Sequence, residues 1–145
     1  MIRKILIALV SSVIFCLSLA FLNYTPENDR EPNVHYFSFA SLVMIYLLYA
    51  TPVYLLLGVP ISLVIDIVKR KIRISNSIFK YVFEVVVYLI SGILAIFLTL
   101  IVLSGGKILL DITDARRLFQ LGAIASLLYY HIYIMSFLLK GKKSI

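Results

Sequence analysis

The hydrophobic pattern of the chain consists of four long apolar runs separated by short polar segments. We predict membrane-spanning segments at about residues 5–23, 36–68, 81–103 and 118–139. Each run has at least about 18 residues, the length that a helix needs to cross the hydrocarbon of a bilayer. Apolar and polar residues do not alternate along the runs, as they would in membrane β-strands. The pattern therefore predicts an all-α fold: a membrane-embedded antiparallel four-helix bundle that forms a single domain over residues 1–145.

The second apolar run is longer than one crossing needs, and it contains Pro52, Gly58 and Pro60. As a helix, residues 36–68 would extend about 50 Å, against a hydrocarbon core of about 30 Å. Two crossings would need about 40 residues and a turn, so we expect one kinked helix. Prolines are tolerated in membrane helices, which favours a static kink. A hinge or a ligand-facing break at these three residues is the alternative.

Lysine and arginine are unequally divided between the two sides that four crossings define. One side would hold ten of them, at the two termini and between the second and third runs: Arg3, Lys4, Lys69, Arg70, Lys71, Arg73, Lys80, Lys140, Lys142 and Lys143. The other side would hold four, which are Arg30, Lys107, Arg116 and Arg117. Cytoplasmic loops are enriched in these residues, so we expect a multi-pass protein of the cell (plasma) membrane with a cytoplasmic N-terminus and a cytoplasmic C-terminus.

The first apolar run also resembles a secretory signal peptide, because Arg3 and Lys4 precede it. Its apolar core is longer than the about 7–15 residues that are usual in a signal peptide. We therefore expect this segment to be a retained membrane anchor.

Composition agrees with a membrane protein and argues against nucleic-acid binding. Hydrophobic residues make up 62% of the chain, whereas about 45–50% is usual in a soluble domain. The net charge of +7 comes from short basic clusters beside the apolar runs, where lysine and arginine meet anionic lipid headgroups. Basic and aromatic residues are not interleaved in the way that nucleic-acid binding requires. The expected partner is thus a bilayer with anionic headgroups at its cytoplasmic face.

Three ionisable residues fall inside the predicted spans, where charge is costly: Asp66, Glu84 and His131. Asp66 lies three residues from Lys69, and Glu84 lies four residues from Lys80. We expect each acid to pair with a nearby lysine or arginine at the membrane interface. The alternative is an acidic pair that faces a water-filled vestibule and handles a cation or a proton.

Tyrosines surround these ionisable residues. Tyr130 and Tyr133 flank His131, and Tyr88 lies one helical turn from Glu84. A tyrosine hydroxyl or a backbone carbonyl would satisfy a neutral histidine, whereas a proton relay or a ligand contact is the alternative. The candidate intramembrane polar site therefore comprises Asp66, Glu84, His131, Tyr88, Tyr130 and Tyr133.

Motifs of catalysis and metal binding do not occur in the chain. It contains one cysteine, Cys16, and two histidines without metal-site spacing. It has no H-E-x-x-H, no G-x-S-x-G and no phosphate-binding loop. We expect no metal, no cofactor and no enzymatic activity.

Two segments of the second run, Tyr49-Ala50-Thr51-Pro52-Val53-Tyr54 and Gly58-Val59-Pro60-Ile61-Ser62, are followed by Asp66. They resemble a family of small, uncharacterised four-span membrane proteins from Bacillus-like Gram-positive bacteria. The resemblance covers these segments and the plan of four spans. It implies a bacterial plasma membrane, and the family has no assigned activity to carry over.

Small residues recur at helical spacing along the spans, and helices in lipid associate through such residues. We expect these stripes to form the inside of the bundle, with the docking of a partner or a second copy as the alternative. The leading hypothesis is a non-enzymatic protein that binds another membrane protein or a second copy, such as an accessory subunit or an immunity protein against a membrane-targeted toxin.

The alternative hypothesis is a small ion or solute transporter or channel that uses the polar residues of spans 2–4, and a holin-like pore former is a weaker third. A cavity shared by Asp66, Glu84 and His131 would favour transport. Separate surfaces, or pairing with lysines, would favour partner binding.

Overall fold

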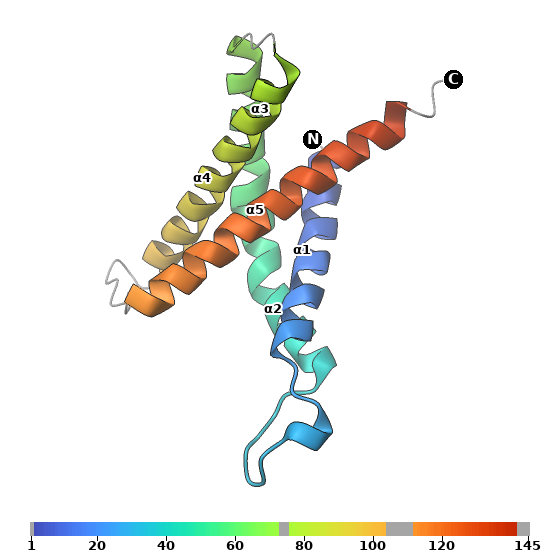
Figure 1. Ribbon diagram of the computed structural model, residues 1–145, viewed down its shortest axis with the longest axis vertical. Coiled ribbons are helices and arrows are strands. Elements are labelled where there is room, and N and C mark those ends of the chain that lie inside the picture. Colours follow the sequence, from blue (N-terminus) through green and yellow to red (C-terminus); the bar gives the residue numbers. More distant parts are fainter. Residues whose placement is uncertain (1, 73–75, 104–111, 142–145) are drawn as a thin grey trace.

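The computed structural model describes residues 2–72, 76–103 and 112–141 and is an all-α bundle (Figure 1). Its elements are α1 (Ile2–Asn23), a short 3₁₀ turn (Glu27–Asp29), α2 (Phe39–Val53), η2 (Tyr54–Gly58), α3 (Val59–Lys71), α4 (Ser77–Leu103) and α5 (Ile112–Gly141). Within the described residues, four helical stretches are long and apolar enough to cross a membrane: Ile2–Asn23, Phe39–Lys69, Ile78–Val102 and Asp114–Phe137. The expected all-α membrane fold is confirmed.

The helices run in alternating directions. In Figure 1 the start of α1, the end of α3, the start of α4 and the end of α5 lie toward one end of the molecule. The connection between α1 and α2 lies at the opposite end. Because α2, η2 and α3 follow one path from end to end, the second run makes a single crossing. Arg73, Lys107, Lys142 and Lys143 of the expected charge division lie outside the described residues.

The irregularity expected in the second crossing is a segment of π-helix, η2, between its two prolines. Pro52 and Pro60 have no backbone N–H, so each removes one bond of the regular helical ladder. The N–H of Val59 donates to the carbonyl of Tyr54, five residues earlier, which is the bond of a π-helix. The chain thus widens one turn and continues in the same direction.

Three helices begin earlier than the apolar runs predict: α1 at Ile2, and α4 and α5 with polar first turns. α4 begins at Ser77, and the side chain of Asn76 caps it by accepting a hydrogen bond from the N–H of Ile78 at 2.9 Å. α5 begins at Ile112 rather than near residue 118, with Asp114 in its first turn. Side-chain acceptors and acidic residues stabilise helix N-termini, so polar first turns extend both helices beyond the apolar runs.

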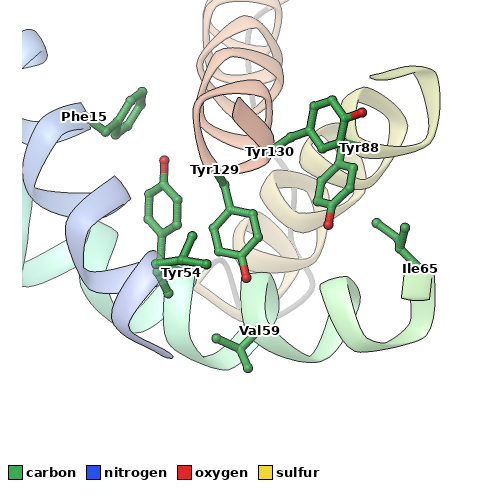
Figure 2. Packing of buried hydrophobic residues seen from close by; sticks show 9 residues of the cluster. Phe15, Tyr54, Val59, Ile65, Tyr88, Tyr129 and Tyr130 are labelled. Atoms are coloured by element: carbon green, nitrogen blue, oxygen red, sulfur yellow. The ribbon is translucent and has the colours of Figure 1, made fainter. Parts of the chain in front are cut away.

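An aromatic cluster fills the region where α1, η2, α4 and α5 meet (Figure 2). The rings of Tyr88 and Tyr130 lie 4.8 Å apart, and Tyr129 lies between Tyr54 and Tyr88 at 6.4 and 6.2 Å. The hydroxyl of Tyr54 donates to the carbonyl of Ala125 at 2.9 Å. Tyrosine suits this position because it buries a large ring and joins helices through its hydroxyl.

Two glycines allow α4 and α5 to approach closely. A Cβ on Gly92 would overlap the carbonyl oxygen of Gly122 and the side chain of Ser126. A Cβ on Gly122 would overlap the side chain of Ile96 and the backbone of Gly92. Small residues of this kind let two helix backbones touch in lipid, so this part of the small-residue pattern lies inside the bundle.

We predict that Gly92→Ala lowers the free energy of unfolding by about 1–3 kcal/mol, because the added methyl meets backbone that cannot move aside. Gly58→Ala is the matched control, since its Cβ would meet only Tyr54 Cδ1, at an ordinary 3.8 Å. That variant should leave stability unchanged or raise it by up to about 1 kcal/mol. Unfolding in mixed detergent micelles measures both. Equal effects of the two substitutions would contradict the close approach of α4 and α5.

Candidate functional site

A network of ion pairs and hydrogen bonds joins α1, α3, α4 and α5 near the end of the molecule where α1 begins. We call it the ion-pair network, and its members are Lys4, Ser62, Asp66, Lys69, Glu84, Tyr129 and Tyr130. Its two acids belong to the candidate polar site expected from the sequence.

Lys4 connects α1 to α3. Its Nζ lies 2.6 Å from Asp66 Oδ2, and it donates to the carbonyl of Ser62 at 2.8 Å and to the hydroxyl of Ser62 at 3.1 Å. An ammonium group has three donors, and these contacts occupy all of them. Lys4 is 9% exposed, so these partners replace water around a buried charge.

The hydroxyl of Ser62 links three elements. It donates to the carbonyl of Val59 at 2.9 Å and accepts from Lys4 and from the hydroxyl of Tyr129, the latter at 3.2 Å. A serine hydroxyl has one proton and two lone pairs, so its capacity is fully used. This fully buried side chain therefore holds α5 against the contact between α1 and α3.

Glu84 forms the second ion pair. Its Oε1 lies 2.8 Å from Lys69 Nζ, and its Oε2 accepts from the hydroxyl of Tyr130 at 2.9 Å. The ring of Tyr133 lies near both lysines, 5.7 Å from Lys4 Nζ and 6.0 Å from Lys69 Nζ. An aromatic face at this distance attracts a cation. The two ion pairs tie α1, α3 and α4 to one another and neutralise the charge that they bury, and the hydroxyls of Tyr129 and Tyr130 add α5.

The structure corrects the pairing expected from the sequence. We expected Asp66 and Glu84 to be paired with lysines or arginines near them in the sequence, at the membrane interface. Asp66 instead pairs with Lys4 on α1, and Glu84 pairs with Lys69 on α3. Glu84 is buried and Asp66 is partly buried, and both face neighbouring helices. A cation from the facing helix reaches such a carboxylate inside the bundle.

His131 lies outside the ion-pair network and is exposed. Its Nδ1 lies 2.7 Å from the carbonyl of Leu127, and its Nε2 lies 3.3 Å from the hydroxyl of Tyr81. A carbonyl only accepts, so Nδ1 donates to Leu127, whereas a tyrosine hydroxyl can donate to Nε2 or accept from it. The histidine thus has both kinds of partner that the sequence suggested, a backbone carbonyl and a tyrosine hydroxyl.

Tyr88 belongs to the aromatic cluster and makes no hydrogen bond to the network. Its side chain is 3% exposed, and in the part of the chain that the structure describes its hydroxyl has no hydrogen-bond partner. Figure 2 shows this hydroxyl pointing from α4 toward α3. The Tyr88 ring packs against Tyr129 and Tyr130 and thereby supports both network tyrosines.

Two hollows adjoin these residues, and the three ionisable residues share neither. A cleft of about 70 Å³ between η2 and the pair α4 and α5 is lined by Gly58, Tyr88 and small residues. A larger hollow of about 560 Å³ is lined by Glu84, Lys69 and Lys80 among others, but not by Asp66 or His131. Of the hinge candidates, Pro52 and Pro60 are exposed and Gly58 lines the cleft. Within residues 2–72, 76–103 and 112–141, no group of three His, Cys, Asp or Glu side chains is placed to hold a metal ion.

Comparisons of this chain with protein-family models, with curated proteins and with solved structures give no match. The resemblance of residues 49–66 to a Gram-positive membrane family therefore stays a prediction.

Four members of the network were not among the expected site residues: Lys4, Ser62, Lys69 and Tyr129. One signal pointed to Lys4, because it lies four residues before Ala8 and seven before Ser11, on the small-residue face of the first span. Ser62 similarly precedes Asp66 by four residues. Helical spacing thus indicates which side chains share a face, but not which helix that face meets.

We predict strong coupling between Lys4 and Asp66. Lys4→Met or Asp66→Asn alone should lower the free energy of unfolding by about 2–3 kcal/mol, because each leaves a partly buried charge unpaired. The double variant should cost less than the sum by about 1–3 kcal/mol. Unfolding of all four proteins in detergent measures this cycle. Lys71→Met, which removes an exposed lysine from the same helix as Asp66, is the control and should cost less than about 0.5 kcal/mol. Strictly additive costs would contradict the ion pair.

Proposed function

We propose that this chain is a non-enzymatic membrane protein that acts by binding another membrane protein, as an accessory subunit or an immunity-type protein does. Partner binding is favoured over transport because Asp66 and Glu84 each have a lysine at ion-pair distance and line no common hollow with His131. A transport path would need polar groups that face one water-filled space. Neither of the two hollows that adjoin these residues provides such a space.

The observation that carries the proposal is an exposed ridge along the second crossing, which we call the proline ridge. It consists of Met44, Leu48, Tyr49, Pro52, Leu56 and Pro60, all exposed and mostly four residues apart. Other helices cover little of the second crossing: 11% of its most apolar stretch is buried inside the protein, against 39% for α1. A large face of this helix is therefore free to meet another protein.

Tyr49 makes the proline ridge unsuited to contact with lipid alone. Its side chain is 65% exposed, and no residue of the described chain forms a hydrogen bond with its hydroxyl. Tyr49 lies ten residues after the start of α2 at Phe39, which is about 15 Å along the helix. The hydrocarbon core is about 30 Å thick, so the hydroxyl faces a depth without water, where an unpaired polar group is costly.

The two prolines add acceptors to the same face. Pro52 and Pro60 have no N–H to donate to the carbonyls of Leu48 and Leu56. In membrane helices, such freed carbonyls are often satisfied by a neighbouring helix. The ridge thus presents a hydroxyl and backbone acceptors side by side. A transmembrane helix with serine, threonine or asparagine on its contact face would complement it.

The proposal includes the orientation and the membrane. Both termini would face the cytoplasm across a plasma membrane. This is supported by the described basic residues: Arg3 and Lys4 lie at the start of α1, Lys69 and Lys71 at the end of α3 and Lys80 at the start of α4, against Arg30 between α1 and α2 and Arg116 and Arg117 near the start of α5, at the opposite ends of the spans.

We predict that single cysteines report this orientation. Cys16 is fully buried, so the natural chain should not react with a membrane-impermeant maleimide. Asn28→Cys, in the exposed turn between α1 and α2, should react on intact cells. Lys71→Cys should react only after the membrane is permeabilised. The reverse pattern would contradict cytoplasmic termini.

We also predict that a photo-crosslinking amino acid at Leu48 joins the chain to one membrane protein in native membranes. The same group at Val13, which is exposed on α1, is the matched control and should give no such adduct. Tyr49→Phe removes only the hydroxyl and should reduce the Leu48 adduct about three- to tenfold, the range for one hydrogen bond between membrane helices. The adduct mass identifies the partner.

Four results would contradict the proposal. Equal adducts from Leu48 and Val13, or a Leu48 adduct insensitive to Tyr49→Phe, would show unspecific collision. An adduct of twice the mass of the chain would make the occupant a second copy. Proton or cation flux into proteoliposomes that falls in Glu84→Gln and His131→Ala would favour transport.

A further inference from the structure

The larger hollow, which we call the inner hollow, lies between α4 and α5 near the end of the bundle where α1 begins. It is lined by residues of three helices: Lys69 on α3, Lys80, Tyr81 and Glu84 on α4, and Tyr130, Tyr133, Ile134 and Phe137 on α5. Its volume of about 560 Å³ lies within the range of about 300–1,000 Å³ that is usual for ligand sites.

The charges of the inner hollow do not cancel. Lys69 is paired with Glu84, but Lys80 is exposed and has no ion-pair partner in the described part of the chain. Both oxygens of the Glu84 carboxylate are occupied, one by Lys69 and the other by the hydroxyl of Tyr130. The hollow thus has an excess of one positive charge on its exposed side, where an anion would bind.

The wall that α5 contributes to the inner hollow is aromatic and apolar. Ile134 and Phe137 lie nearly one helical turn apart on α5, and the Phe137 side chain is 58% exposed. An anion that bound only to the lysines would leave this surface uncovered. A ligand with an anionic group and an attached apolar chain would cover both walls.

We propose that the inner hollow binds one anionic phospholipid, with its phosphate against Lys80 and Lys69 and the start of an acyl chain along Ile134 and Phe137. Basic pockets between membrane helices on the cytoplasmic side bind anionic lipid headgroups in this way. The inner hollow is formed by α3, α4 and α5, whereas the proline ridge belongs to the second crossing before α3 and the start of α3. This proposal therefore stands independently of the partner at the ridge.

The test uses the full chain in a zwitterionic detergent, titrated with phosphatidylglycerol or with phosphatidylcholine of the same acyl chains. Native mass spectrometry counts bound lipids, and thermal unfolding reports stabilisation. We expect one tightly held phosphatidylglycerol and no equivalent phosphatidylcholine. Lys80→Gln should weaken its binding about fivefold, as expected for the loss of one lysine near a lipid surface.

The side chain of Lys80 is exposed and makes no hydrogen bond or ion pair within the described chain, and its backbone N–H bond to the carbonyl of Asn76 does not depend on the side chain, so its replacement leaves the fold intact. Lys80→Arg should retain binding, and Lys80→Glu should abolish it. Lys71→Gln removes the same charge from the same end but outside the inner hollow, and it should leave binding unchanged.

Three results would overturn the proposal. An equal loss of phosphatidylglycerol binding in Lys71→Gln would mean that the basic end of the bundle attracts the lipid without a specific site. Equal binding of phosphatidylcholine would remove the role of charge. Equal stabilisation by inorganic phosphate, or by glycerophosphoglycerol without acyl chains, would remove the role of the apolar wall and of the lipid.

Discussion

A charge inside a membrane protein must have an opposite charge or several hydrogen-bond donors and acceptors beside it, because lipid offers neither. In this chain the requirement is met between helices. Asp66 on α3 is neutralised from α1, and Glu84 on α4 is neutralised from α3. Buried ion pairs add little net stability compared with apolar packing, but breaking one is costly. In this chain the ion pairs fix the position of each helix along its neighbours, that is, the register of the helices. Sliding any of these helices by one turn would separate a lysine from its acid.

Register has to be set by such contacts because apolar side chains pack against lipid nearly as well as against one another. Two further contacts do the same for α5. The glycine contact with α4 lies toward its first half, and Tyr129 and Tyr130 bind the ion-pair network in its second half. Held at both places, α5 runs obliquely to α1 in Figure 1. The inner hollow lies where the last turns of α5 and the first turns of α4 leave space that the side chains line but do not fill.

The sequence was sufficient for the features that depend on one helix at a time. Run length predicted four crossings, and the length of the second run with its prolines predicted one interrupted crossing. The acids were recognised because hydrocarbon makes them exceptional. Their partners were not, because pairing depends on which helices are neighbours. Lys4 was interpreted as a flanking charge of the first span, although its spacing from Ala8 and Ser11 places it on the buried face. The π-helix at η2 was also not predicted. A proline shows where a backbone hydrogen bond of the helix is lost, but it does not show in which register the following hydrogen bonds form.

Because the charges of the ion-pair network face the inside of the bundle, the groups that remain on the membrane-facing surface are the ones that other molecules would meet. Unpaired charges along the spans would favour the passage of ions. A hydroxyl and carbonyls without their usual hydrogen-bond donors instead favour contact with another helix that can form hydrogen bonds with them. On the second crossing these groups coincide: Tyr49 is beside Leu48, whose carbonyl loses its donor to Pro52. A lone tyrosine facing lipid would cost free energy for no gain in packing, and two outward prolines add a similar cost. All three lie on one ridge of one helix, and a single docked helix would satisfy them together.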